Sequence, residues 1–471
     1  MKYWKRNDST RRLKYRCTHF TRLVYLLTVV SLLSTSLPLL TKIDSDVLYY
    51  FMPVSTKRSI YYVALTDKNL GIQCDVLQVW RFGDLRIYKC IMTSRDAVEV
   101  SKHALGVFMP KENKICLLEK PYTVVQTSLR SNNIADYKQF HRRTNMFLGN
   151  GVVVCIIDTG IDYLHPDFFR GNRSVVKCLV SMFYMSNDTH TYLVWIPEVN
   201  GSLSDAWELD RYLYAIYGEY AWMDDNGHGT HVAGIVASQG NKGFVGLAPG
   251  VDLIVIKAFN VLGVADLDTC LESLEWVYNY TKLFNIKIVN ISWGCEGDNR
   301  GIDPLSIAID YISEKLGIIF VCAVGNSGNY PFTVNIPACA HKAVAVGAYD
   351  VANNKIAKFS SLGTTNDLRI KPDFLGAGVD IISCKPVTVK CYLEEMYPQI
   401  VYNEYYMVLS GTSMATPCVV SVFASYYEKL VETTTVKPSP DILYNYVVSR
   451  CIRINEHCKD PISGWGIPVI Q

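Results

Sequence analysis

Hydrophobic residues change their spacing along the chain near residue 150. Beyond that point, short runs of continuously apolar residues recur, each followed by a glycine-rich turn and then by a segment with helical spacing. The runs occupy residues 152–157, 253–257, 286–292, 318–323 and 343–348. Strands that are apolar on both faces and alternate with helices are typical of a parallel sheet covered on both sides. We therefore expect an α/β fold from about residue 150 onward.

The preceding region, from about residue 57 to 125, has a different pattern. Residues 58–65 and 84–93 alternate like strands, and residues 93–105 place Ala97, Val100 and Ala104 on a helical stripe. Residues 114–118 are expected to close this unit as a further strand. The pattern predicts a small α+β unit, joined to the α/β region by a polar linker at residues 126–143.

The N-terminus carries a cluster of basic residues followed by an apolar run at residues 23–40. A basic segment before an apolar one is the pattern of a secretory signal. The run is almost long enough to span a bilayer, so residues 1–41 are either a cleaved signal peptide or a signal anchor. Both alternatives send the remainder of the chain into the secretory pathway.

Composition narrows the class of protein. The chain has 471 residues, of which 49% are hydrophobic and 19% charged, and this balance is typical of a globular protein. Its formal net charge is only +2, and its one basic cluster lies at the N-terminus. A nucleic-acid partner, which normally requires a basic face on the folded domain, is therefore not expected.

The chain contains 15 cysteines, and leaving out Cys17 in the basic N-terminal segment gives an even number. Disulfides are therefore expected in an oxidising compartment, with Cys384–Cys391 and Cys451–Cys458 able to close short loops. No C-x-x-C pair occurs, which argues against a structural zinc. Glycosylation sequons begin at Asn172, Asn187, Asn200, Asn279 and Asn290.

Candidate catalytic residues lie where the predicted strands end. Asp158 closes the strand in GVVVCIIDTGID, a position where open α/β sheets collect functional groups, although an aspartate there can also cap a helix. In DDNGHGTHVAGIVA, His228 opens a predicted helix and His231 lies on the same side. The two histidines are a structural pair, a base with a structural neighbour, or a metal site. A metal site of the metalloprotease type would also need a glutamate on the same helix, and that residue is missing.

A serine lies at a second strand–turn–helix junction. In LSGTSMATP, Ser413 is placed at the start of a helix, where it serves as a helix cap or as a nucleophile beside a helix N-terminus. VNISWG and VGNSG end two further strands with Ser292 and Asn326.

Taken together, these motifs resemble the subtilisin family of serine proteases over about residues 150–467. The resemblance implies an α/β fold with a parallel sheet flanked by helices, preceded by a small α+β propeptide domain. It implies that Asp158, His228 and Ser413 form the catalytic triad, and that the Asn326 side chain stabilises the oxyanion. The corresponding domains are an inhibitory propeptide at residues 42–135 and a catalytic domain at residues 136–471.

The same resemblance implies substrate and metal sites. The strand Ser292-Trp293-Gly294 and the segment at Leu262 and Gly263 are expected to pair with an extended peptide. Asn335 falls at the base of the primary pocket, and Ile336–Pro337 resembles a cis-proline turn. The chemistry needs no cofactor. A structural calcium is expected at Asp167 and Asn241, with a helix cap as the alternative role of Asp167.

These observations predict a secreted serine endopeptidase that acts on polypeptides and is inhibited by its own propeptide until it cuts itself between Val125 and Arg143. The alternative is an inactive pseudoprotease that acts as a scaffold. A dibasic-specific convertase fits less well, because no β-sandwich follows GWGI. Two inserts, an aromatic-rich one between Phe168 and His228 and another at Cys384–Tyr406, shape substrate choice or only cover surface.

Overall fold

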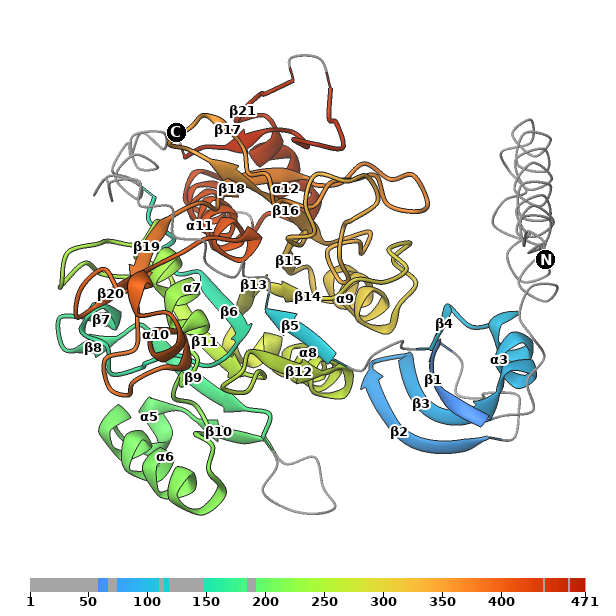
Figure 1. The fold of residues 1–471 in the computed structure, drawn as a ribbon, viewed down its shortest axis with the longest axis horizontal. Helices are drawn as coiled ribbons and strands as arrows, with labels where there is room; N and C mark the ends of the chain where they lie inside the picture. The colour runs from blue at the N-terminus through green and yellow to red at the C-terminus, as the bar shows by residue number, and fades with distance from the viewer. Residues whose placement is uncertain are drawn as a thin grey trace, which may run out of the picture.

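The computed structural model describes residues 58–66, 74–109, 114–117, 147–183, 192–434, 437–455 and 458–470. These residues form a large body and a smaller N-terminal unit (Figure 1). The signal segment at residues 1–41, the linker at residues 126–143 and the domain boundary at residue 135 lie outside the described residues. Within the described ranges, no helix is long and apolar enough to cross a membrane.

A nine-stranded sheet forms the centre of the large body, in the order β10-β9-β11-β6-β13-β15-β16-β17, with β18 also paired to β16. The strands are β6 (Val153–Asp158), β9 (Val176–Ser181), β10 (Leu193–Trp195), β11 (Asp252–Lys257), β13 (Ile286–Ile291), β15 (Ile319–Ala323), β16 (Val344–Asp350), β17 (Lys355–Ile356) and β18 (Phe374–Ala377). All pairings except β9–β10 and β16–β17 are parallel. The expected α/β class is confirmed, and every predicted apolar run is a strand.

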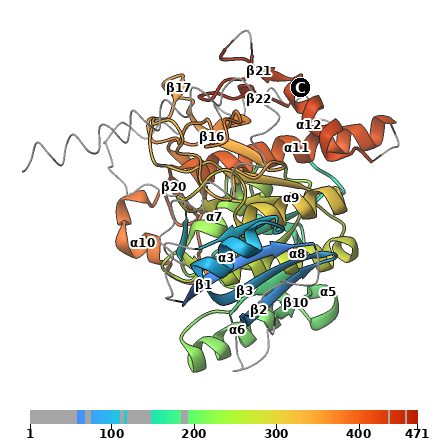
Figure 2. The same ribbon diagram turned by 90° about the vertical axis from the view of Figure 1, so that its right-hand side faces the viewer.

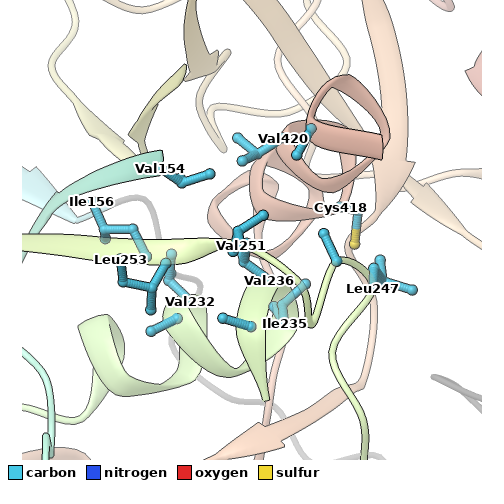
Figure 3. Close-up of a cluster of buried hydrophobic side chains, with 14 of the residues drawn as sticks. Val154, Ile156, Val232, Ile235, Val236, Leu247, Val251, Leu253, Cys418 and Val420 are labelled. Carbon is cyan, nitrogen blue, oxygen red and sulfur yellow. The ribbon is translucent and has the colours of Figure 1, made fainter. Parts of the chain in front are cut away.

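Side chains on each central strand point alternately into two hydrophobic layers. Val154 and Ile156 of β6 pack in one layer, against α7 (His228–Ala237) and α11 (Thr412–Thr434), as Figure 3 shows for part of this cluster. Val153 and Cys155 belong to the other layer, beneath α8 (Leu267–Phe284) and α9 (Pro304–Leu316). Burial on both faces is the physical reason that these strands are apolar throughout rather than alternating.

Both inserts contain regular structure. The first carries α5 (Pro197–Asn200) and α6 (Leu203–Tyr217), and the second carries α10 (Tyr392–Met396) and η2 (Pro398–Ile400) between β19 (Ile381–Cys384) and β20 (Tyr406–Leu409). The remaining elements of the body are η1 (Pro166–Phe168), β7 (Phe169–Arg170), β8 (Arg173–Ser174), α12 (Pro440–Val448), β21 (Cys451–Ile452) and β22 (Ile467–Pro468).

The N-terminal unit is a four-stranded sheet in the order β2-β3-β1-β4 with one helix. Its elements are β1 (Arg58–Leu65), β2 (Asp75–Phe82), β3 (Leu85–Thr93), α3 (Ser94–Ser101) and β4 (Gly106–Phe108). The predicted strands at 58–65 and 84–93 and the helix are confirmed. The expectation that residues 114–118 close this unit is wrong. The strand β5 (Lys114–Leu117) lies inside the large body, between β12 (Val264–Asp266) and β14 (Trp293–Gly294), where two strand edges are open to pairing (Figure 1).

The N-terminal sheet packs on α8 of the large body, as Figure 2 shows from the side. Tyr62 donates a hydrogen bond to Asp268 at 2.6 Å, and Lys89 forms an ion pair with the same carboxylate. Gln78 donates to Glu272 at 3.0 Å, and Glu272 is only 2% exposed in this interface. These polar contacts, with one buried carboxyl group, accompany an apolar interface in which Trp80 and Phe82 share a buried hydrophobic cluster with residues of α8 and α9.

No disulfide joins the described cysteines, which are all thiols. The two expected bridges are absent for different reasons. Cys384 Sγ lies beside Gly234, whereas Cys391 Sγ lies beside Gly227. Gly227 and Gly234 are seven residues apart along the helix, which corresponds to about 10 Å. This distance is too long for a sulfur–sulfur bond. Cys451 instead donates to the carbonyl oxygen of Val447 at 3.4 Å, while Cys458 is exposed.

Acidity is predicted to strengthen the docking of the N-terminal unit. Burial raises the pKa of Glu272 from 4.5 to about 7, an effect to which the neighbouring Glu275 adds, while the bond from Gln78 and the charge of Lys89 oppose it. A docked unit therefore holds a proton that an exposed Glu272 releases. Docking should be tightest below about pH 4.5, weaken as the pH rises to about 7, and then level off.

Hydrogen exchange of residues 75–93 in the full chain measures this docking between pH 4.5 and 8. Glu272→Gln should remove the pH dependence, and Glu99→Gln, on exposed α3, should retain it. An unchanged profile in Glu272→Gln would contradict the assignment.

Candidate active site

The carboxyl ends of the central strands bring the predicted catalytic residues to one edge of the sheet. Asp158 is the last residue of β6, and His228 is the first of α7. Their side chains are fully buried, and His228 Nδ1 lies 2.7 Å from Asp158 Oδ1. Because Nδ1 faces the carboxylate, the proton shared with Asp158 lies on that nitrogen, and Nε2 is the atom available for proton transfer.

A second buried carboxylate, which sequence reasoning did not single out, fixes the start of α7. Asp224 accepts hydrogen bonds from the main-chain N–H groups of Gly227 and Thr230 and from the Thr159 hydroxyl. The Thr159 hydroxyl oxygen in turn accepts from Gly229 N at 2.9 Å. This network ties the first turn of α7 to the end of β6, so it holds His228 beside Asp158. The adjacent aspartates that open DDNGHGTH were the available signal.

The serine lies at the same edge of the sheet, at the start of the helix α11. Ser413 is the second residue of α11, and its hydroxyl donates to the carbonyl oxygen of Ser292 at 2.6 Å. Ser292 Oγ donates back to the carbonyl oxygen of Ser413 at 2.9 Å. This reciprocal pair fixes the start of α11 against the segment between β13 and β14.

Asn326 lies in the turn after β15, and its side-chain oxygen accepts from both Thr412 N and the Thr412 hydroxyl at 3.0 Å. Because Thr412 holds the oxygen, the orientation of the amide is fixed, and its NH2 group points away from Thr412. The Asn326 side chain is therefore held by Thr412, the residue immediately before Ser413.

The structure also brings together the predicted substrate-binding residues. Trp293 and Gly294 form β14, and the carbonyl oxygen of Gly263 accepts a hydrogen bond from Leu117 N at 3.2 Å. Leu262 is exposed next to Gly263. Asn335 is buried beside Gly294 and Gly325, and its side-chain oxygen has no hydrogen-bond partner among the residues that the structure describes. Ile336–Pro337 is a cis peptide, as the sequence pattern indicated.

His231 has a different environment from His228. It is fully buried, and its Nε2 lies 2.9 Å from the carbonyl oxygen of Ile381. Burial lowers its pKa to about 3, so the ring is neutral. In the described part of the chain, the one metal-compatible cluster of side chains comprises His165, Asp167 and Cys384, and neither His228 nor His231 belongs to it. The geometry therefore favours a structural His231 over a two-histidine metal site.

The residues expected to bind calcium do not fit a hard cation. Both oxygens of Asp167 are occupied by donors of the protein itself: Lys242 N on one, and the hydroxyls of Ser238 and Tyr406 on the other. Asn241 turns its NH2 group toward the carbonyl oxygens of Pro166 and Phe169, 2.8 Å from each. Calcium requires six to eight converging oxygens, and here N–H and O–H groups converge instead.

The two inserts line an open pocket of about 580 Å³, which Asp225, three residues before His228, also lines. Trp207 and Tyr220 line it from the first insert, and Tyr392 from the second. The second insert is joined to the segment before α7, because Tyr392 N donates to the carbonyl oxygen of Asp225 at 2.8 Å. Both inserts therefore contact the polypeptide that carries His228, and they are not remote surface additions.

Comparison with known proteins finds similarity to the family that the sequence motifs indicated. Residues 149–440 match the model of the subtilase family. Serine protease AprX of Bacillus subtilis is 29% identical over 355 residues, which cover 72% of this chain and 70% of that protein. Subtilisin Savinase of Lederbergia lenta is 30% identical over 283 residues, covering 60% and 78% respectively.

Among solved structures, the CspB protease of Clostridium perfringens is similar in fold, with a TM-score of 0.58 and 18% sequence identity. The similarity covers 72% of this chain and 97% of that one.

The Asp167 network predicts that stability does not depend on calcium. Excess chelator should leave the melting temperature unchanged, because both oxygens of the Asp167 carboxylate already accept hydrogen bonds from the protein. Tyr406→Phe should lower the free energy of unfolding by about 1–3 kcal/mol, since it removes one donor from a buried carboxylate. Tyr405→Phe is the matched control and should be nearly neutral. A melting temperature that falls in chelator and recovers with calcium would show that this account of the site is incorrect.

Proposed function

This chain belongs to the subtilase family and is a serine endopeptidase, and we propose that it is secreted as a zymogen and hydrolyses peptide bonds through Asp158, His228 and Ser413. The observation that carries the assignment is the 2.7 Å contact between the buried His228 and Asp158, at the same sheet edge as Ser413. A serine hydroxyl is a weak nucleophile, and it requires an oriented imidazole to remove its proton.

In this mechanism, Ser413 Oγ attacks the carbonyl carbon of the scissile bond while its proton passes to His228 Nε2. Asp158 keeps Nδ1 protonated and stabilises the imidazolium that forms. The imidazolium then donates its proton to the leaving amine as the C–N bond breaks, which leaves an acyl group on Ser413. Water attacks the acyl-enzyme and gives a proton to His228, which returns it to Ser413 Oγ as the ester bond breaks, so that the carboxylic acid and the free serine are released.

The tetrahedral intermediates carry a negatively charged oxygen that needs donors already in place. Asn326 supplies its side-chain N–H, oriented by the two bonds from Thr412 to its oxygen. Ser413 supplies its main-chain N–H at the start of α11, where the helix dipole also favours negative charge.

The proposal of a zymogen is supported by the position of β5. This strand precedes the polar linker and occupies the edges of β12 and β14, and the residue before β14 is Ser292, whose carbonyl oxygen accepts the hydrogen bond from Ser413. A peptide in that position blocks the substrate, so the N-terminal unit, proposed to span residues 42–135, acts as an inhibitor of the catalytic domain at 136–471. Secretion is supported by the basic and apolar pattern at residues 1–41.

The rival function is an inactive scaffold, which needs a catalytic group to be missing or misplaced. The contact between His228 and Asp158 and the fixed orientation of Asn326 argue against it. A binding protein gains nothing from a buried aspartate–histidine pair, because burial of such groups is costly unless the geometry is used.

Asn326→Ala should lower kcat by roughly 10²–10³-fold with little change in KM, the size of effect found when subtilisin loses the corresponding donor. The physical reason is that the amide contacts the oxygen only after it becomes charged. Steady-state kinetics on a peptide substrate measure both constants, and the melting temperature of the variant checks its folding. If KM rises and kcat is unchanged, Asn326 binds the ground state and the assignment is wrong.

Self-processing is predicted to release the mature enzyme by a cut between Val125 and Arg143, in the polar linker that follows β5 in the sequence. The wild type and Ser413→Ala should be expressed in a protease-deficient secretory host and their N-termini sequenced. The wild type should begin within that stretch, and Ser413→Ala should remain uncut. Normal trimming of Ser413→Ala would rule out self-processing.

A further inference from the structure

The small hydrophobic core of the N-terminal unit contains two cysteines. Cys90 of β3 is fully buried in the cluster that lies between the sheet and α3. Cys74, the residue before β2, is half-buried and packs against the same cluster. Of the cysteines that the structure describes, these two alone belong to this core. Both thiols therefore lie on the face of the sheet that points away from α8.

The pairing of β2 with β3 explains why the two side chains lie close together. The strands are antiparallel, and Val76 lies opposite Cys90. The pairing continues without a shift from Val76 back to the first residue of β2. Cys74 is two residues before Val76, so it lies on the same face of the sheet and diagonally across from Cys90. Diagonal neighbours on one face are within reach of each other's side chains.

The two thiols are in contact. The Cys74 side chain is hydrogen-bonded to that of Cys90, and Cys90 Sγ also donates to the carbonyl oxygen of Tyr61 at 3.8 Å. Burial raises the pKa of Cys90 to about 12, and the neighbouring Cys74 thiol adds to the rise. Cys90 therefore stays a neutral thiol, whereas the half-buried Cys74 is the sulfur that a reagent in solution reaches.

From this arrangement we propose that Cys74 and Cys90 are joined by a disulfide in the secreted protein, and that this bond holds β2 in the position from which it docks on α8. The inference rests on the proposed secretion, because an oxidising compartment is where such a bond persists. It assigns a covalent modification to the N-terminal unit and concerns a site remote from the catalytic residues.

The oxidant that the reaction needs is a disulfide, such as oxidised glutathione or the active-site disulfide of a thiol oxidoreductase. The Cys74 thiolate attacks one sulfur of the oxidant, which forms a mixed disulfide and releases the other sulfur as a thiol. Cys90 then loses its proton and attacks the Cys74 sulfur, which releases the second thiol. The two protein thiols are oxidised to one disulfide, and the oxidant is reduced to two thiols that carry the two protons.

The strand that this bond secures carries much of the contact with the body. Gln78 of β2 donates to Glu272, and Arg81 N donates to Glu275 at 2.7 Å. Trp80 of the same strand is buried in the hydrophobic cluster shared with α8 and α9. Because β2 is an edge strand that pairs only with β3, a crosslink to β3 restricts its separation from the sheet.

Peptide mapping tests whether the bond exists. The full chain with Ser413→Ala, which keeps the N-terminal unit attached, should be secreted, alkylated under denaturing conditions without reductant, and digested with trypsin. Cleavage after Arg81 and Lys89 places the two cysteines on separate peptides. Mass spectrometry should find these peptides linked and neither cysteine alkylated. Alkylation of both, or Cys74 joined to a different cysteine, would overturn the inference.

Hydrogen exchange of residues 75–82 tests what the bond does. Adding dithiothreitol to the Ser413→Ala chain should speed the exchange of β2 about 10-fold or more, because the crosslink no longer limits its separation from β3. Cys74→Ser in the same chain should exchange at the faster rate without reductant and respond no further to it. Cys458→Ser, which changes an exposed cysteine of the large body, is the matched control and should respond as the parent chain does. Exchange that reduction leaves unchanged in the parent chain would refute the role of the bond.

A further arm separates this inference from the proposed function. The purified, reduced chain should form the same bond when it is equilibrated with oxidised glutathione. If the chain is not secreted but forms the bond in this buffer, the proposed secretion fails and the pairing stands. If both thiols stay free in the secreted chain and in this buffer while the wild-type enzyme cleaves casein, the inference fails and the proposed function stands.

Discussion

A single hydrogen bond between two buried side chains, His228 Nδ1 and Asp158 Oδ1, is the interaction on which the site depends. A carboxylate is tolerated inside a protein only when donors surround it, and Asp158 also accepts from Thr159 N at 2.8 Å. The parallel register of β6, β11 and β13 determines that these groups meet, because it brings the ends of three strands to one edge. Asp224 then anchors α7 to the same edge. These hydrogen bonds fix the orientation of the side chains that the chemistry requires.

In the proposed zymogen, the N-terminal unit and a substrate compete for the same edge. Between them, β12 and β14 leave a gap one strand wide, and an unpaired strand edge attracts any extended peptide. The chain fills this gap with its own β5, attached to a sheet that docks on α8 through a shared hydrophobic cluster and a few polar contacts. Because β5 uses main-chain hydrogen bonds, its side chains add selectivity rather than the bulk of the binding. In the proposed function, inhibition and substrate binding are therefore two consequences of one geometry.

Most of the fold and the candidate catalytic residues could be predicted from the sequence. The central strands are apolar on both faces, which makes runs such as residues 152–157 visible without any tertiary information. Asp158, His228 and Ser413 stand at strand–helix junctions within long motifs, so their neighbours in sequence identify them. Sequence reasoning failed where partners are distant in the chain. The position of β5 depends on edges more than 140 residues away, and its own four residues give no sign of it.

The side chains named for calcium and for the two disulfides have other partners for the same reason. Asp167 is saturated by Tyr406, which a second insert carries from 239 residues away, and the cysteines of that insert face different turns of α7. Labelling with a fluorophosphonate tests the central claim most directly, because the reagent phosphonylates only an activated serine. The active wild-type enzyme should be modified at Ser413 alone, and His228→Ala should lose the labelling while it remains folded. Undiminished labelling of His228→Ala, or none of the processed wild type, would contradict the account.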